Sequence, residues 1–351
     1  MKKTRVMIVE DSPVISALLE YCVSSDPRLE VCATAGSAEE ALDTFEAIAP
    51  DVIAMDIRLP GIDGLEATRR IMSLRPVPIV VVAASIESGK WNSTPMEALR
   101  AGALTVLEKP VGTTHDDYAA LSERLCTQLF IMSQVKLVRR QRSGETHAAD
   151  GGRSRASSNT AGAFGMLGIV CSTGGPGALV QLLGALGPEF PLPILLVQHM
   201  TASFLGGFAS WLDTVCPFSV TVVKDGCIPA AGALHMAPAE RHLRLDAGKL
   251  WLDAGDAVSF QRPSGTVLFQ SMARDLGAAA LGVLLTGMGD DGAAGLLAIR
   301  RAHGHTIAED ESTAVVYGMP AVAVRIGAVM ESLPLPAIAP RVRDLVSCRN
   351  S

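Results

Sequence analysis

The sequence lacks an excess of basic side chains. Its 351 residues include 30 lysines and arginines against 36 aspartates and glutamates, which gives a formal net charge of −6. A chain of this charge has no general attraction for phosphate backbones, and its second half shows neither a helix-turn-helix pattern nor a basic stripe. We therefore expect no nucleic acid among its partners, and a transcription factor is disfavoured.

Paired cysteine motifs and long apolar runs are also missing. The seven cysteines are scattered and never spaced C-x-x-C, which is typical of reduced thiols in the cytoplasm rather than of disulfides or a zinc site. The longest nearly apolar stretch, residues 276–289, falls short of the roughly 18 residues that span a bilayer. The first residues, MKKTRVMIVEDS, have too few apolar side chains for a signal peptide. We expect a cytoplasmic protein with no direct membrane insertion.

Apolar and helical patterns alternate along most of the chain and predict an α/β protein. Between residues 5 and 133, five apolar runs are each followed by a helical pattern, which predicts a doubly wound five-stranded parallel sheet. The stretch QRSGETHAADGGRSRASSNTAGA then has no apolar period and is typical of a flexible linker. We predict a first domain at 1–131, a linker at 132–163, and a second α/β domain at 164–346 with a mostly parallel sheet and an antiparallel hairpin.

Acidic residues follow two strands of the first predicted domain. Glu10 and Asp11 come at the end of the first strand, and Asp56 ends the third. The carboxyl ends of parallel strands form one crevice, so these carboxylates should converge. Their oxygens suit Mg²⁺, and a cation would relieve their mutual repulsion. Lys109, at the end of the fifth strand, would bring a positive charge to the same crevice. The set predicts a site that accepts a phosphoryl group on a carboxylate, although any one such acid is more often a solvated strand cap.

The motifs VEDSP, MDIRLPGIDG and LEKP, in this order and spacing, resemble the receiver domain of two-component response regulators. The resemblance implies that Asp56 takes a phosphoryl group from a histidine kinase. It further implies that Glu10, Asp11 and Asp56 hold Mg²⁺, and that Lys109 pairs with the phosphate.

One position departs from the receiver pattern. Receivers usually carry Thr or Ser at the end of the fourth strand, where the hydroxyl bonds the phosphate, but Ala83 stands there in this sequence. Alanine cannot donate this bond. Ser85 would replace it only if the loop were shifted, so the strength of the phosphorylation switch stays open.

In the second predicted domain, Ser172 lies on a glycine-rich turn, CSTGGPG, between a buried strand and a helix. Such a turn brings backbone N–H groups and the positive end of the helix beside the hydroxyl, as a nucleophile with an oxyanion hole requires. The turn does not match the G-x-S-x-G elbow of α/β-hydrolases. Taken alone, the stretch is also compatible with an N-cap serine or an anion-binding turn.

Two further strand ends supply partners for a nucleophilic serine. His199 directly follows the strand PILLVQ, where it would act as a base, although a lone histidine more often has no chemical role. After the strand GVLLT come Asp290 and Asp291, either of which would fix the imidazole tautomer. A serine, a histidine and an aspartate from three strand ends would then meet.

The same segment allows a second interpretation. Residues 287–292, GMGDDG, satisfy G-x-G-x-x-G between a strand and a helix, with acids at 309–311 at a suitable distance. This pattern also occurs in dinucleotide sites. Two carboxylates would, however, occupy the place of the pyrophosphate, so we hold the dinucleotide-binding enzyme as the weaker alternative.

The motifs CSTGG, QHM, APAERHLRL, RPSGTVLFQSMA, LLTGMGDDGAAG and AEDESTAVVYGMP resemble the chemotaxis protein-glutamate methylesterase (CheB) family. The resemblance implies that Ser172 is the nucleophile, His199 the base and Asp291 the orienting carboxylate, with the backbone N–H groups of Thr173 and Met288 as the oxyanion hole.

The implied function is hydrolysis of glutamate methyl esters, and deamidation of glutamines, on the cytoplasmic helices of methyl-accepting chemoreceptors, under control of phosphorylation. The esterase itself would need no cofactor. A catalytically silent response-regulator scaffold stays as an alternative, although the sequence fills all three triad positions.

Overall fold

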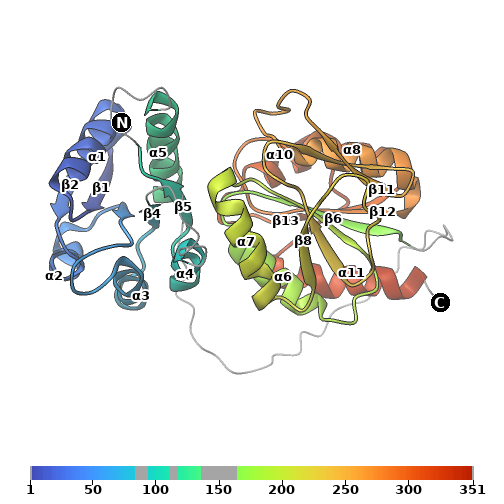
Figure 1. The fold of residues 1–351 in the computed structure, drawn as a ribbon, viewed down its shortest axis with the longest axis horizontal. Helices are drawn as coiled ribbons and strands as arrows, with labels where there is room; N and C mark the ends of the chain where they lie inside the picture. The colour runs from blue at the N-terminus through green and yellow to red at the C-terminus, as the bar shows by residue number, and fades with distance from the viewer. Residues whose placement is uncertain (1, 84–93, 111–117, 136–163, 350–351) are drawn as a thin grey trace.

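The computed structural model describes residues 2–83, 94–110, 118–135 and 164–349, which form two α/β domains (Figure 1). Ser85 and most of the predicted linker lie outside the described residues. Helix α5 of the first domain ends at Ser133, just inside the segment predicted as a linker.

The first domain is built on a five-stranded sheet of order β2-β1-β3-β4-β5, in which all neighbours are parallel. The strands are β1 (Thr4–Val9), β2 (Leu29–Ala35), β3 (Val52–Met55), β4 (Ile79–Ala83) and β5 (Thr105–Glu108). The helices are α1 (Pro13–Ser25), α2 (Ala38–Ile48), α3 (Gly64–Leu74), α4 (Thr94–Ala101) and α5 (Tyr118–Ser133). Helices α1 and α5 pack on one face, and α2, α3 and α4 on the other. The prediction of a doubly wound parallel sheet is confirmed.

Side-chain caps open helices α2 and α3 of this domain. Ser37 Oγ accepts a hydrogen bond from the backbone N–H of Glu40 at 3.2 Å and opens α2. Asp63 Oδ1 accepts one from the N–H of Glu66 at 2.7 Å and opens α3. Such caps satisfy the free N–H groups of a first turn and fix where these two helices begin.

The second domain contains a seven-stranded parallel sheet of order β14-β13-β12-β6-β7-β9-β8 and a separate antiparallel pair, β10-β11. The sheet strands are β6 (Met166–Cys171), β7 (Ile194–Gln198), β8 (Ser219–Val222), β9 (Ala233–Met236), β12 (Ala280–Leu284), β13 (His305–Glu309) and β14 (Glu331–Leu333). The antiparallel strands are β10 (His242–Asp246) and β11 (Lys249–Asp253). The mostly parallel sheet and the hairpin are both as predicted.

Helices cover both faces of this sheet. They are α6 (Gly175–Leu186), α7 (Ala202–Val215), α8 (Gly265–Leu276), α9 (Ala293–Arg301), α10 (Met319–Arg325) and α11 (Leu335–Arg349), with a 3₁₀ turn, η1 (Gly277–Ala279). Helices α6, α7 and α11 share one buried apolar cluster with the sheet, and α8, α9 and α10 share the other. The central strands β6, β7 and β12 are therefore almost completely buried.

The two domains meet along the edge of the first sheet. Helix α4 lies against α6 and α7, as Figure 1 also shows. Leu99 packs against the apolar cluster of the second domain, and Val316 packs against that of the first. The Arg100 guanidinium lies 5.5 Å from the ring centroid of Trp211, within cation–π range. Each domain thus contributes side chains to the other's packing.

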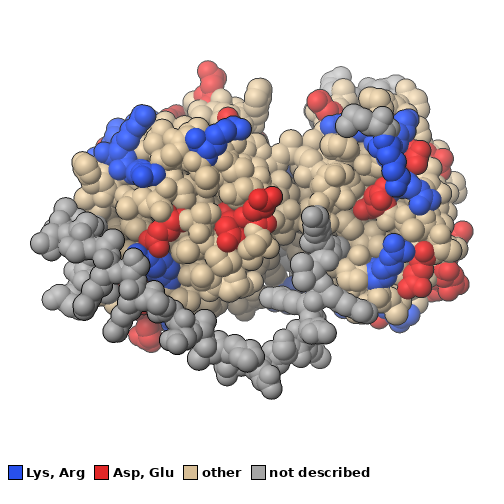
Figure 2. All heavy atoms as spheres, turned by 180° about the vertical axis from the view of Figure 1, so that it is seen from behind, with Lys and Arg blue, Asp and Glu red and all other residues tan. Residues whose placement is uncertain are grey.

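Two further properties of the molecule are the distribution of its charged side chains and the length of its apolar helices. On the face shown in Figure 2, basic and acidic side chains are interspersed over both domains and form no continuous basic stripe. Among the described helices, none is both long enough and apolar enough to traverse a lipid bilayer.

Candidate active site

Three neighbouring strands of the second domain bring the predicted triad residues to one edge of the sheet. Strands β12, β6 and β7 are adjacent, and their carboxyl ends lead to Asp291, Ser172 and His199. The N–H of His199 donates to the carbonyl of Cys171 at 3.0 Å, and the N–H of Ser172 donates to the carbonyl of Thr286 at 3.0 Å. All three triad residues line one cavity of about 1300 Å³.

The imidazole of His199 is oriented by Asp291. Its Nε2 lies 2.8 Å from Asp291 Oδ2, and the two side chains are only 6% and 2% exposed. A carboxylate accepts but does not donate, so Nε2 carries the proton and Nδ1 is the basic nitrogen. Nδ1 is buried and has no hydrogen-bond partner among the described residues. The Nδ1 atom thus has the unprotonated, unbonded state that a general base would require.

Asp291 is held by the start of helix α8. Ser264 Oγ donates to Oδ1 at 2.6 Å, and the backbone N–H groups of Gly265 and Thr266 donate at 2.6 and 3.0 Å. Burial raises the pKa of Asp291, but the bonds from His199, Ser264 and Thr266 outweigh this effect and hold the pKa below its usual value. The positive end of the helix also favours the anion.

The N-terminus of α8 was missed by sequence reasoning, which used RPSGTVLFQ only as a family motif. The signal was present, because Ser264 precedes an apolar helical pattern as an N-cap residue would. What sequence did not show is that this helix end points at Asp291. Burial also separates the two candidate acids: Asp291 is buried, whereas Asp290 is exposed.

Ser172 is not the N-cap of α6. That position belongs to Gly174, whose φ of 80° suits glycine, and it makes no side-chain cap bond. The Ser172 hydroxyl is therefore not used to cap the helix, which removes the N-cap interpretation. Among the described residues, no hydrogen bond joins the Ser172 hydroxyl to the imidazole. Nucleophile–base contacts are often loose before a substrate binds.

Two backbone N–H groups near Ser172 have no acceptor within the described ranges of the chain. Neither the N–H of Thr173 nor that of Met288 donates to any described residue, and both residues line the cavity. The loop that carries Met288 approaches closely, since a Cβ on Gly287 would lie 2.8 Å from Ser172 Cβ. These N–H groups have the character that an oxyanion hole requires.

The neighbouring thiol does not compete with Ser172 as a nucleophile. Cys171 is fully buried, and burial raises the pKa of its thiol well above the usual value. Its Sγ donates to Gln198 Oε1 at 3.0 Å, and Gln198 Nε2 donates to the carbonyl of Ser172 at 2.9 Å. Cys171 and Gln198 thus support the backbone of the turn, while the thiol stays protonated.

Buried polar groups also support the turn from below. Thr286 Oγ1 donates to the carbonyl of Thr173 at 2.9 Å and accepts from the N–H of Val316 at 2.8 Å. The N–H of Thr286 donates to Glu309 Oε2 at 2.9 Å. Glu309 is 1% exposed, and burial raises its pKa more than the bonds from Thr286 and Thr313 lower it.

This network decides against the dinucleotide interpretation. Glu309, the acid that would have bound a ribose, is buried and bonded to the N–H of Thr286. Within the G-x-G-x-x-G segment, the N–H of Gly287 donates to the carbonyl of Val316, and the N–H of Gly292 donates to Thr266 Oγ1. These N–H groups are therefore occupied within the protein and are not free to bind a pyrophosphate.

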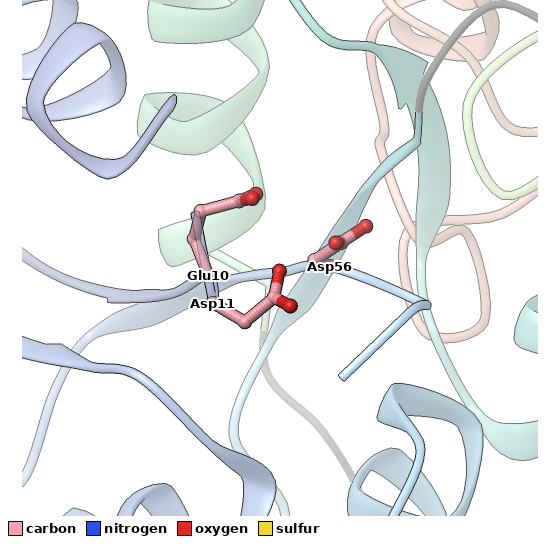
Figure 3. Close-up of side chains that lie close together, drawn as sticks. All are labelled: Glu10, Asp11 and Asp56. Atoms are coloured by element: carbon pink, nitrogen blue, oxygen red, sulfur yellow. The ribbon is translucent and has the colours of Figure 1, made fainter. Parts of the chain in front are cut away.

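The predicted acidic site of the first domain is also assembled. Glu10, Asp11 and Asp56 lie side by side (Figure 3), with carboxylate oxygens within 4.8 Å of one another. Lys109 Nζ lies 2.7 Å from Glu10 Oε2 and 2.9 Å from Asp56 Oδ2. Burial and the nearby Asp56 raise the pKa of Glu10 despite the bond from Lys109. Strand β4 ends on Ala83, as predicted, so no hydroxyl is present at that position.

The carboxylate cluster fits a hard divalent cation by its donor chemistry. Three carboxylates offer oxygen ligands of the kind that Mg²⁺ prefers. Glu10 and Asp56 are buried while Asp11 is exposed, so one side of the cluster is accessible to solvent, and Mg²⁺ commonly keeps several of its water ligands.

The buried Glu309 generates a test of stability against pH. Because its folded-state pKa is raised, its contribution to stability is fully present below the unfolded pKa of about 4.5 and is lost as pH rises through the folded value. Glutamine resembles the protonated form at every pH. The difference in the free energy of unfolding between Glu309→Gln and the native chain, measured with urea, should therefore increase in favour of the variant by about 1 kcal/mol from pH 5 to pH 8.

The exposed neighbour Glu311 provides the control, and Glu311→Gln should show no such gain. If the difference in the free energy of unfolding between Glu309→Gln and the native chain stayed constant with pH, the raised pKa of Glu309 would be contradicted.

Comparison with known proteins shows the family to which the chain belongs. The chain matches the CheB methylesterase family model over residues 167–342 and the response regulator receiver domain model over residues 6–116. It is 53% identical to protein-glutamate methylesterase/protein-glutamine glutaminase 2 of Paramagnetospirillum magneticum, over 98% of each chain. It is 40% identical to the protein-glutamate methylesterase/protein-glutamine glutaminase of Nitrosospira multiformis, over 98% of this chain and 97% of that one.

Among solved structures, the catalytic domain of the Thermotoga maritima CheB methylesterase is 32% identical, covering 53% of this chain and 98% of that one with a TM-score of 0.49. The two family models together account for both domains of the structure. The chain therefore belongs to the CheB methylesterase family and carries a response regulator receiver domain ahead of its catalytic domain.

Proposed function

We propose that this chain is a protein-glutamate methylesterase and protein-glutamine glutaminase in which Ser172, His199 and Asp291 carry the reaction. Its substrates are methylated glutamates and glutamines on the cytoplasmic helices of methyl-accepting chemoreceptors, so it acts in the cytoplasm during chemotactic adaptation. The observation that carries the proposal is the 2.8 Å bond between His199 Nε2 and Asp291 Oδ2, on strand ends adjacent to that of Ser172.

The reaction begins at the Ser172 hydroxyl. Nδ1 of His199 removes its proton while Oγ attacks the carbonyl carbon of the ester, and Asp291 stabilises the imidazolium that forms. The tetrahedral intermediate collapses, His199 returns the proton to the departing methoxy oxygen, and methanol leaves. Water, activated by the same imidazole, then hydrolyses the glutamyl ester of Ser172. A glutamine side chain follows the same course and releases ammonia.

The N–H groups of Thr173 and Met288 would stabilise the oxyanion of each tetrahedral intermediate. Removing one such donor typically costs about 3 to 4 kcal/mol of transition-state stabilisation. The bonds that Thr286 makes to the Thr173 carbonyl and the Val316 N–H hold this part of the site in place. The proposed oxyanion hole is therefore built on a rigid and buried support.

Phosphorylation of the receiver domain regulates this activity in the proposal. Asp56 accepts the phosphoryl group from a histidine kinase, and Lys109 pairs with it, given its 2.9 Å contact with Asp56. Glu10, Asp11 and Asp56 would hold Mg²⁺, which neutralises charge on the phosphoryl group during its transfer. The esterase site itself uses only protein groups.

The contact between domains supports a link between the two sites. The cavity that contains Ser172 is also lined by α4, β5 and α5 of the receiver domain. Gln128 of α5 lies 3.5 Å from the hydroxyl of Thr173, next to the nucleophile. In the resting state the receiver thus restricts access to Ser172, and phosphorylation of Asp56 shifts the population toward an open arrangement.

The nucleophile is tested by methanol release from a methylated chemoreceptor fragment. Ser172→Ala removes the attacking oxygen, so release should fall by about 10³-fold or more. Equal release by Ser172→Ala and the native chain would refute the mechanism. If the phosphorylated native chain released no methanol, the chain would be a silent response-regulator scaffold instead.

The orienting carboxylate is tested against its exposed neighbour. Asp291→Asn keeps the side-chain shape but removes the charge that fixes the tautomer, so kcat should fall by about 10² to 10⁴. Asp290→Asn is the matched control and should change kcat less than about threefold. Equal losses in the two variants would show that Asp291 has no special role.

The regulatory link is tested with a small-molecule phosphodonor. The native chain should release methanol faster as the phosphodonor is added, whereas Asp56→Asn should not respond. Ala83→Thr restores a hydroxyl at the end of β4 and should increase the stimulation relative to the native chain. Stimulation that persists in Asp56→Asn would contradict the proposed route.

A further inference from the structure

Phe260 is an exposed aromatic residue on the rim of the Ser172 cavity. Its side chain is 100% exposed, although it lines the cavity together with Met288, which is 42% exposed. A large apolar side chain left entirely in water gains free energy when a partner covers it. Its position on the same cavity as Ser172 restricts which partner that can be.

Phe260 occupies the tip of a tight hairpin turn. Val258 and Gln261 exchange two backbone hydrogen bonds of 3.1 and 3.0 Å, so Ser259 and Phe260 form a two-residue loop. Both loop residues have positive φ values, 51° and 60°. Such turns favour Asn and Gly, and a bulky side chain there is unfavourable. The turn therefore projects an aromatic ring outward at a cost in stability.

The base of this segment is firmly anchored. His242 Nε2 donates to the carbonyl of Asp256 at 2.9 Å, and His242 Nδ1 accepts from the N–H of Ser264 at 3.1 Å. Arg262 donates to the carbonyl of Gly255 at 3.3 Å and to Glu240 at 2.9 Å.

One of these anchors leads directly to the active site. Ser264 also donates to Asp291 through its hydroxyl, at 2.6 Å. The position of the Phe260 turn is therefore fixed relative to the triad by a short chain of hydrogen bonds, through His242 and Ser264.

We propose that Phe260 is a docking residue that contacts the chemoreceptor helix beside the modified glutamate. The inference rests on the proposed function and names a determinant of substrate choice. A glutamyl side chain that reaches Ser172 is short, so the helix that carries it must come to the rim of the cavity. An apolar side chain one helical turn away would then cover the Phe260 ring. Aromatic side chains that a partner buries completely are frequent among the residues that dominate the affinity of protein contacts.

The occupant is a protein helix rather than a small molecule because of where the ring lies. Phe260 projects from the rim into solvent, whereas the reacting ester must lie at Ser172 on the strand ends. One small ester cannot fill both places, but a helix that spans the rim can.

The experiment compares two substrates of the same full-length protein. Values of kcat/KM are measured for a methylated receptor fragment and for a small soluble glutamate methyl ester, with folding of each variant checked by circular dichroism. Phe260→Ala should lower the ratio of the receptor value to the small-ester value by about tenfold, mainly through KM. Phe260→Trp should keep the ratio near that of the native chain.

Ile228 provides the matched control, because it is also a large exposed apolar residue, 71% exposed, but does not line the cavity. Ile228→Ala should leave the ratio unchanged. An unchanged ratio in Phe260→Ala, or an equal fall in both variants, would overturn the inference.

A binding measurement separates this inference from the mechanism. In the Ser172→Ala background, which cannot form the proposed glutamyl enzyme, the Kd for the receptor fragment should rise about tenfold when Phe260→Ala is added. An unchanged Kd would overturn the role of Phe260 even if the triad is correct. If Kd rose about tenfold as expected but Ser172→Ala did not reduce methanol release, the docking role of Phe260 would be supported and the role of Ser172 as nucleophile would be refuted.

Discussion

The carboxylate of Asp291, at the N-terminus of helix α8, is the interaction on which the catalytic domain depends. It receives hydrogen bonds from the Ser264 hydroxyl and from the first backbone N–H groups of the helix, which keep it ionised although it is 2% exposed. Its other contact fixes the imidazole of His199. A buried anion without these donors would be strongly unfavourable. The N-terminus of α8 therefore stabilises the Asp291 carboxylate, and this carboxylate in turn orients the imidazole of His199.

The same carboxylate connects features that are far apart in the sequence. Ser264 links Asp291 through His242 to the segment that carries Phe260, on the rim of the cavity. Thr286, at the end of the strand that leads to Asp291, supports the turn of Ser172 and Thr173. The proposed catalytic residues, the proposed oxyanion hole and the proposed docking residue thus share one network of buried hydrogen bonds. The receiver domain also contributes residues to the lining of the cavity, which supports the proposal that it controls access to Ser172.

Much of this arrangement could be predicted from the sequence. Alternating apolar runs and helical patterns gave the two parallel sheets, because a buried parallel strand needs a continuous apolar run. The positions of the acidic and basic residues at the strand ends were enough to predict that four side chains lie close together: Glu10, Asp11, Asp56 and Lys109. The choice of Asp291 over Asp290, in contrast, came from the family resemblance, since their positions differ by one residue and only burial separates them physically.

Other parts depend on contacts between distant segments. The α8 N-terminus, the contact of Thr286 with Glu309, and the anchors of the Phe260 turn through His242 each join residues 14 to 27 positions apart. The bond from Thr286 to Thr173 joins residues 113 positions apart, and no local pattern reports such pairing. The assignment of the proton to Nε2 of His199 also depends on a contact between distant segments, because it follows from which ring nitrogen faces Asp291.

The most direct measurement of the central claim is covalent labelling by a serine-directed fluorophosphonate, followed by peptide mass spectrometry. Such reagents react with a hydroxyl that an adjacent base activates. The account predicts a single label on Ser172, with a rate that falls by about 10²-fold or more in His199→Ala. Labelling at another residue, or labelling of Ser172 at an unchanged rate in His199→Ala, would contradict it.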